Sequence, residues 1–302
     1  MPMEEFYSQY LTFAQSVVSS GCKGNINIVE VQERIRALVD LVSKESDRVI
    51  RLIVANHTSE NYLIAHCLNS AILSLLLGIE LRYSEENLEK LGIAALLHDI
   101  GMERLFETVN RPVKLSPNDF EEVKKHPLFA VKALESLEAD PEILRAIQEH
   151  HERENGSGYP QGLTENQIHK FASVIAVADV YQAMIHPRPY RDKNYPFQAI
   201  KHMVESRGIF NRLALKALLE VISIFPLETI VELNSGSIAK VVKINKGSLM
   251  SPQVEMLYNP NGKPADSAVI DLAKMPFSHI QRCFTQEELD VWLKQQVPTQ
   301  KF

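Results

Sequence analysis

Helical patterns dominate the chain from about residue 59 to residue 224, and they favour a mainly α architecture for this region. Apolar residues recur there at helical spacing, with interruptions at Gly92 and Gly101. A loop at 152–163 holds three glycines and a proline. Helices bury their apolar faces against one another, so we expect a helical bundle. Its segments include NYLIAHCLNSAILSLLLG, LEKLGIAALLHDIG, FEEVKKHPLFAVKALESL, EILRAIQEHH and FASVIAVADVYQAMI. Asn118, with Glu121 three residues later, is the expected cap of the third segment.

Two regions of different character flank the bundle. Residues 1–20 and about 29–55 each have one apolar helix face. Three interpretations are open: a small helical domain, a pair of helices that dimerises, or helices that pack on the bundle. After Pro226, apolar and polar residues alternate, many of them are β-branched, and NSG and NPNG are turn signals between the runs. This pattern predicts a small antiparallel sheet, followed by a last helix. We expect a helical segment at 1–54, a helical domain at 55–225 and a β-rich appendage with a final helix at 226–302.

Length and composition exclude several classes of protein. The chain has 302 residues, which at about 150 residues per domain predicts two domains, and its 45% hydrophobic and 23% charged residues are typical of globular proteins. The net charge of −6 argues against coating DNA. Three separated cysteines, Cys22, Cys67 and Cys283, favour a reduced, cytoplasmic compartment. The apolar run at 71–81 is too short to span a membrane, so we expect no membrane partner.

Five histidines and two aspartates lie at intervals within the helical segments. A lone histidine of this kind is usually a hydrogen-bonded core residue, but a buried carboxylate must be paired or bind a metal. Imidazoles and carboxylates together suit cations such as iron, manganese, nickel or zinc. The candidates are His66, His98, Asp99, His126, His150, His151 and Asp179.

The motifs around these residues resemble those of a known family. They are HDIG at 98–101, KKHP at 124–127, HHERENGSGYP at 150–160 and VADVYQAM at 177–184. Together they resemble the HD-GYP group of the HD superfamily of metal-dependent phosphohydrolases. Its members are cyclic di-GMP phosphodiesterases or their non-catalytic relatives. The resemblance covers roughly residues 55–225 and implies an HD-type helical bundle.

Carried over residue by residue, the resemblance implies that all seven candidates are metal ligands. Asp99 would bridge two divalent ions, with iron expected first, and orient a hydroxide that attacks the phosphodiester of cyclic di-GMP or a related cyclic dinucleotide. Some members hold a third metal through a glutamate at the place of Tyr62, so we expect two ions here. The implied substrate-binding residues are Gly158, Tyr159, Arg188 and Arg191.

Four positions depart from the family pattern. Met102 replaces the lysine of HDIGK, and a thioether can neither donate a hydrogen bond nor neutralise charge. Asn155 and Gln182 each stand where aspartate is common, and Ala130 stands where glycine is usual. None of these changes removes an implied metal ligand.

Three functions stay open at this point. The first is a phosphodiesterase, slowed by the change at Met102, that opens cyclic di-GMP to pGpG. A variant of this hypothesis has the enzyme hydrolyse pGpG further to GMP. The second is a non-enzymatic module that binds nucleotide or a protein partner. The third is an enzyme with another substrate, such as cyclic GMP-AMP. A homodimer through the N-terminal helices is a further expectation.

Overall fold

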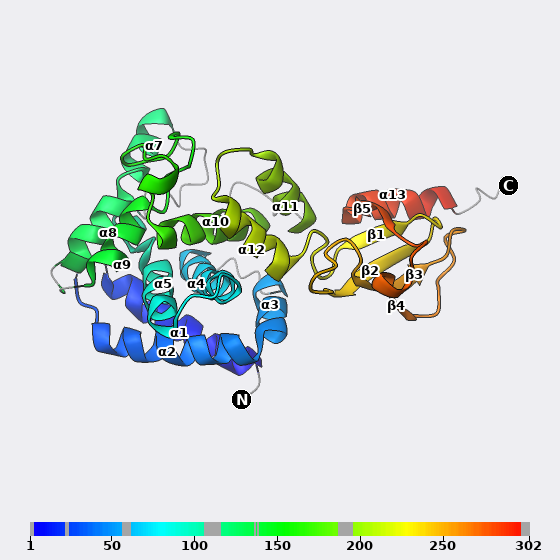
Figure 1. Ribbon diagram of the computed structural model, residues 1–302, viewed down its shortest axis with the longest axis horizontal. Coiled ribbons are helices and arrows are strands. Elements are labelled where there is room, and N and C mark those ends of the chain that lie inside the picture. Colours follow the sequence, from blue (N-terminus) through cyan, green and yellow to red (C-terminus); the bar gives the residue numbers. More distant parts are fainter. Residues whose placement is uncertain are drawn as a thin grey trace. The chain divides into compact units, whose positions relative to one another are not determined.

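The protein folds, in a computed structural model, into helices and one small sheet (Figure 1). The structure describes residues 3–21, 24–55, 62–105, 116–135, 137, 139–186 and 196–296. Contacts divide the chain into one unit of Met1–Asn194 with Met203–Leu218 and a second unit of Tyr195–His202 with Leu219–Phe302.

The first unit is helical. Two helices divide between the units, α11 (Pro196–Glu205) and α12 (Arg212–Ile222). The other elements are α1 (Met3–Gly21), α2 (Ile28–Lys44), α3 (Ser46–Ala55), α4 (Tyr62–Glu80), α5 (Glu85–Leu97), the 3-10 helix η1 (Ile100–Leu105), α7 (Pro117–Val123), α8 (His126–Glu135), α9 (Pro141–Glu149), the 3-10 helix η2 (Glu165–Gln167) and α10 (Lys170–Ile185).

The core of this unit forms around α4. The helix is apolar on nearly every side, which is typical of a helix surrounded by others. Helices α5, α10, α1 and α2 pack against it (Figure 1). By length and composition α4 could cross a membrane, but 83% of its most apolar window is buried inside the protein. The apolar run that we judged too short for a membrane is therefore part of a core helix.

Two helical segments are shorter than predicted. The 29–55 segment ends at Lys44 and restarts at Ser46, giving α2 and α3. The FEEVKKHPLFAVKALESL segment is also two helices, α7 and α8. Pro127 has no backbone N–H to donate to the Val123 carbonyl, so the helix ladder is interrupted there.

The predicted cap of that segment is wrong by two residues. We expected Asn118, with Glu121 three residues later, to start the helix. Instead Ser116 caps α7: its Oγ accepts the Asp119 N–H at 3.1 Å, and Asp119 accepts the Ser116 N–H at 3.0 Å. Pro117 follows as the first helical residue, where a missing N–H costs nothing.

A buried polar contact joins the N-terminal helix to the core. The Tyr7 hydroxyl on α1 donates to Asn69 Oδ1 on α4 at 3.1 Å. The Asn69 amide nitrogen lies 3.1 Å from His186 Nε2, at the end of α10. One chain of hydrogen bonds therefore joins three segments that are far apart in sequence.

The second unit holds the predicted antiparallel sheet. Its strand order is β4-β3-β2-β1-β5, and the last helix supplies Leu289 and Trp292 to a core with Ile238 and Phe284. Trp292 therefore packs the final helix against the sheet. The elements are β1 (Ile230–Leu233), β2 (Ile238–Lys243), β3 (Gln253–Tyr258), β4 (Val269–Asp271), β5 (Ile280–Phe284) and α13 (Gln286–Gln296), with a 3-10 turn η3 (Leu272–Lys274).

Candidate metal centre

The seven candidate ligands come from five helical segments and lie together inside the first unit. All but His151 are buried. A close approach of backbones helps to assemble them, since a Cβ on Gly101 would overlap the His126 carbonyl. The residues are His66 on α4, His98 and Asp99 after α5, His126 at the start of α8, His150 and His151 after α9, and Asp179 on α10.

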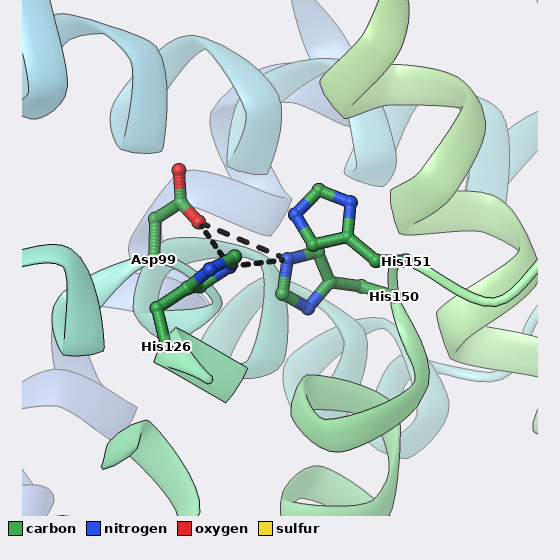
Figure 2. Close-up of side chains that lie close together, drawn as sticks. All are labelled: Asp99, His126, His150 and His151. Carbon is green, nitrogen blue, oxygen red and sulfur yellow. Dashed lines mark hydrogen bonds and ion pairs between the residues drawn. The ribbon is translucent and has the colours of Figure 1, made fainter. Parts of the chain in front are cut away.

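These residues form two groups. Within each group, the potential ligand atoms lie within 4.8 Å of one another. One group is Asp99, His126, His150 and His151, and the other is His66, His98 and Asp179. Figure 2 shows the first group, with Asp99 and His126 directed at His150.

Asp99 lies between the two groups and turns one oxygen to each. Its Oδ1 is 3.1 Å from His126 Nε2 and 3.8 Å from His150 Nε2. Its Oδ2 is 3.6 Å from His98 Nε2 and 3.8 Å from His66 Nε2. A carboxylate in this position can contact two cations at once.

Helix ends orient three of the histidine rings. The last carbonyls of a helix have no partner within the helix. His98 Nδ1 donates to the Ala95 carbonyl at 2.7 Å, and His150 Nδ1 donates to the Ile147 carbonyl at 2.6 Å. His126 Nδ1 donates at 2.7 Å to the Val123 carbonyl, the group that Pro127 leaves free. With Nδ1 used in this way, each ring directs Nε2 at the cluster, and in a neutral ring Nε2 carries a lone pair.

These lone pairs face one another without a donor between them. His126 Nε2 lies 3.3 Å from His150 Nε2, and both Nδ1 atoms are already donors. His98 Nε2 is buried and has no hydrogen-bond partner. A proton or a cation between such atoms removes the conflict, and the donor set suits a divalent metal. The residues therefore fit the ions that the sequence predicts.

Burial and neighbouring charges set the protonation of the cluster. Burial lowers the pKa of His98 to about 4, and burial with the neighbouring His150 lowers the pKa of His151 well below its ordinary value. Burial raises the pKa of Asp179, but the hydrogen bond from His66, at 2.9 Å, and the charges of the neighbouring histidines together lower it by more. The cluster at neutral pH therefore offers ionised carboxylates and, at His98 and His151, neutral imidazoles, the forms that bind metals.

The comparison with known families agrees with this geometry. Residues 31–212 match the HD domain family. The chain belongs to the HD domain family. Residues 230–291 match a second family, described as a KOW domain associated with the HD domain, which covers the sheet of the second unit.

Relatives and a solved structure of the same kind are known. The HD domain chain is 31% identical over 244 residues to cyclic di-GMP phosphodiesterase PA4108 of Pseudomonas aeruginosa, covering 78% of this chain and 59% of that protein. It is 32% identical over 210 residues to cyclic di-GMP phosphodiesterase PdeB of Borreliella burgdorferi, covering 69% and 55%. The chain thus spans little more than half the length of these relatives.

The fold also matches a solved structure, that of Bd1817, a HDG"Y"P protein from Bdellovibrio bacteriovorus. The TM-score is 0.59 at 20% identity, over 70% of this chain and 68% of that one. The predicted HD-GYP resemblance and mainly α fold are confirmed.

The glycine-rich loop of the HD domain folds back on its own start. A Cβ on Gly158 would overlap the backbone of His151, Glu152 and Arg153, so only glycine fits there. Tyr159 stacks on His151, with ring centres 4.6 Å apart, and its N–H donates to the His151 carbonyl. Tyr159 therefore lies in contact with one of the candidate metal ligands.

Two carboxylates that hold this region were missed by the sequence analysis. Glu152 is 2% exposed and accepts the N–H groups of Gln161 and Leu163 at 2.6 and 2.9 Å. Glu149, also buried, accepts from Arg145 at 2.7 Å and from the His169 N–H. The signal for Glu152 was its place in HHE, because an acid between a histidine pair and a glycine loop needs partners.

The departures from the family pattern occupy different surroundings. Met102 lies half-buried on η1, with its N–H donating to the Asp99 carbonyl at 2.9 Å. Asn155 closes a turn of the loop by accepting from Ser157 at 2.7 Å. Gln182 is fully buried on α10, and Ala130 packs beside Gly101. Arg188 and Arg191 lie outside the described residues.

Proposed function

We propose that this protein is a metal-dependent phosphodiesterase that hydrolyses cyclic di-GMP to pGpG. The observation that carries the proposal is the position of Asp99, with one carboxylate oxygen toward each of two histidine groups. The named function of the relatives from Pseudomonas aeruginosa and Borreliella burgdorferi supports the substrate class.

The charge of the cluster explains why metals are needed. The two buried carboxylates, Asp99 and Asp179, carry negative charge, and a phosphodiester is also an anion. Bound divalent cations would reverse this repulsion, polarise the phosphate and lower the pKa of a water molecule. The residues that would hold them are His66, His98, Asp99, His126, His150, His151 and Asp179.

Two ions are the expected number. Each of the two groups supplies several donors, and Asp99 would be shared. The position that carries a glutamate in three-metal relatives holds Tyr62, whose ring stacks on His66 at 5.4 Å. Iron is our first expectation, with manganese, nickel and zinc as alternatives, because imidazole and carboxylate ligands suit all four.

The protein's own side chains would orient the substrate. Tyr159, held against His151 by the Gly158 loop, offers an aromatic face and a hydroxyl beside the cluster. Arg188 and Arg191 would supply guanidinium groups for bidentate contact with phosphate.

A turnover assay with defined metals tests the proposal. Full-length protein is stripped with a chelator, reloaded with iron(II), manganese, nickel or zinc, and incubated with cyclic di-GMP. Separation of the nucleotides by chromatography should show pGpG only in metal-loaded samples. The Asp99→Ala variant is the matched control and should form none. Cyclic GMP-AMP in parallel tests the alternative substrate.

The second candidate is a nucleotide-binding module with little turnover. Met102 favours it, since no cation stands at the position where family members carry lysine. Measurable binding of cyclic di-GMP to metal-loaded protein without pGpG would support this candidate over the enzyme.

Location and assembly complete the proposal. A cytoplasmic location is supported by the free thiols of Cys67 and Cys283. Helices α1 and α2 pack their apolar faces on α4 and α5, so a homodimer through them would use their exposed faces. Light scattering of the purified protein tests the dimer.

A further inference from the structure

Arg153 lies two residues after the His150–His151 pair and is a half-buried cation without an acidic partner among the described residues. Its Nη1 donates to the carbonyls of His150 and Glu152 at 3.1 and 2.8 Å. Its guanidinium lies 5.7 Å from the centre of the Phe210 ring. Across the described ranges, no carboxylate lies within ion-pair distance of it.

The surroundings of this guanidinium leave one edge unused. Nη1 is occupied by the two carbonyls, whereas Nε and Nη2 have no protein acceptor among the residues described. Those two nitrogens form the edge that pairs with two oxygens of a carboxylate or phosphate. Neither nitrogen is among the fully buried atoms that lack a partner, so this edge of the half-buried side chain is accessible to an anion.

The open edge belongs to a residue at the border of the metal cluster. Burial lowers the pKa of Arg153, and the charge of Asp179 opposes that effect. The carbonyl that anchors Nη1 is that of His150, one of the candidate ligands. An anion bound to the cluster would therefore lie in the same electrostatic environment as Arg153.

We propose that Arg153 binds a phosphate group of the cyclic dinucleotide and supplies the positive charge that Met102 does not. This role rests on the proposed function. It deepens that function by assigning a substrate-binding residue that lies within the described part of the chain.

Variants at two positions test the role. Arg153→Gln should raise the Kd for cyclic di-GMP, and the KM for its hydrolysis, by about 10-fold or more, because a charge-assisted bidentate contact is lost. Metal content and Tm should stay near the wild-type values. Adding Met102→Lys to Arg153→Gln should recover most of the binding. The matched control is Arg34→Gln, since Arg34 also lies 5.7 Å from a phenylalanine ring, that of Phe13 on α1.

The outcomes separate this inference from the proposed function. If wild-type protein turns over cyclic di-GMP and Arg153→Gln has the same Kd and KM, the inference is wrong and the function stands. If Arg153→Gln loses metal in step with activity and Met102→Lys restores nothing, Arg153 is only a clamp on the histidine turn, and the inference is also wrong. If the wild-type protein neither binds nor hydrolyses the nucleotide, both are overturned.

Discussion

The Glu152 carboxylate accepts a hydrogen bond from the backbone N–H of Gln161 at 2.6 Å, across the whole glycine-rich loop. A second N–H, from Leu163, reaches the other oxygen. The acid therefore holds the two ends of the loop together, directly after two candidate metal ligands. It ties the loop to the cluster without itself being one of the seven ligand candidates.

Glu152→Ala should destabilise the protein by about 2–4 kcal/mol, because two backbone N–H groups lose a buried, charged acceptor. Urea denaturation measures the free energy of unfolding. Metal content should change little at temperatures where the variant is folded. Glu121→Ala is the control, since its side chain is 67% exposed, and it should change stability by less than about 0.5 kcal/mol. Equal stability of the two variants would contradict the anchoring role.

Asp99→Ala should reduce bound metal from two ions per chain to one or none, since both groups share this carboxylate. Elemental analysis after reconstitution and desalting measures the stoichiometry. Asp40→Ala, at an exposed pair with Lys44, should keep the wild-type value. Wild-type stoichiometry in Asp99→Ala would show that the ligand assignment is wrong.

Met102→Lys should raise turnover of cyclic di-GMP by up to about 100-fold, because it restores a donor and a charge next to Asp99. Initial rates of pGpG formation at saturating metal provide the measurement. Met102→Leu controls for the loss of the thioether and should behave like the wild type. A rate that is unchanged or lower would mean that Met102 does not limit the enzyme.

Acidification should destabilise the metal-free protein between about pH 6.5 and pH 4. Burial lowers the pKa of His98 to about 4, so the unfolded chain binds a proton that the folded protein rejects. The free energy of unfolding then falls with pH through this window, by about 3 kcal/mol for His98 alone. His151 acts in the same direction, whereas the pKa of His126, which burial lowers but Asp99 raises by more, acts against it.

Urea midpoints of chelator-treated protein, taken from about pH 7 down to about pH 4.5, check this dependence. The His98→Asn variant should be less stable at neutral pH but show a flatter slope. A wild-type stability that is constant or rises on acidification would contradict the prediction.

Much of the fold follows from sequence patterns. The all-round apolar character of α4, the amphipathic α9 and the alternating strands after Pro226 were visible as such, because burial imposes those periods. Helix ends were less predictable. Ser116 and Asn118 are both good caps, and the choice between them depended on Pro117. The predicted boundaries at 54/55 and 225/226 stay predictions.

The site was predictable in its residue types but not in its geometry. The histidines and aspartates could be named from their motifs, yet the orientation of the rings depends on which carbonyls each helix end leaves free. The role of Glu152 depends on a loop that brings the N–H groups of Gln161 and Leu163, nine and eleven residues later, back to its carboxylate. No local sequence pattern predicts this return.

The Tyr7–Asn69 hydrogen bond bears on how short this protein can be made. The match to the HD domain begins at residue 31, after α1 has ended, yet α1 covers α4 and its Tyr7 satisfies Asn69, one turn from His66. Trimming the chain to the matched residues would expose the apolar face of α4 that α1 covers. It would also leave the buried Asn69 side chain without the hydrogen bond from Tyr7. We therefore expect the smallest piece that folds to be longer than the matched residues 31–212.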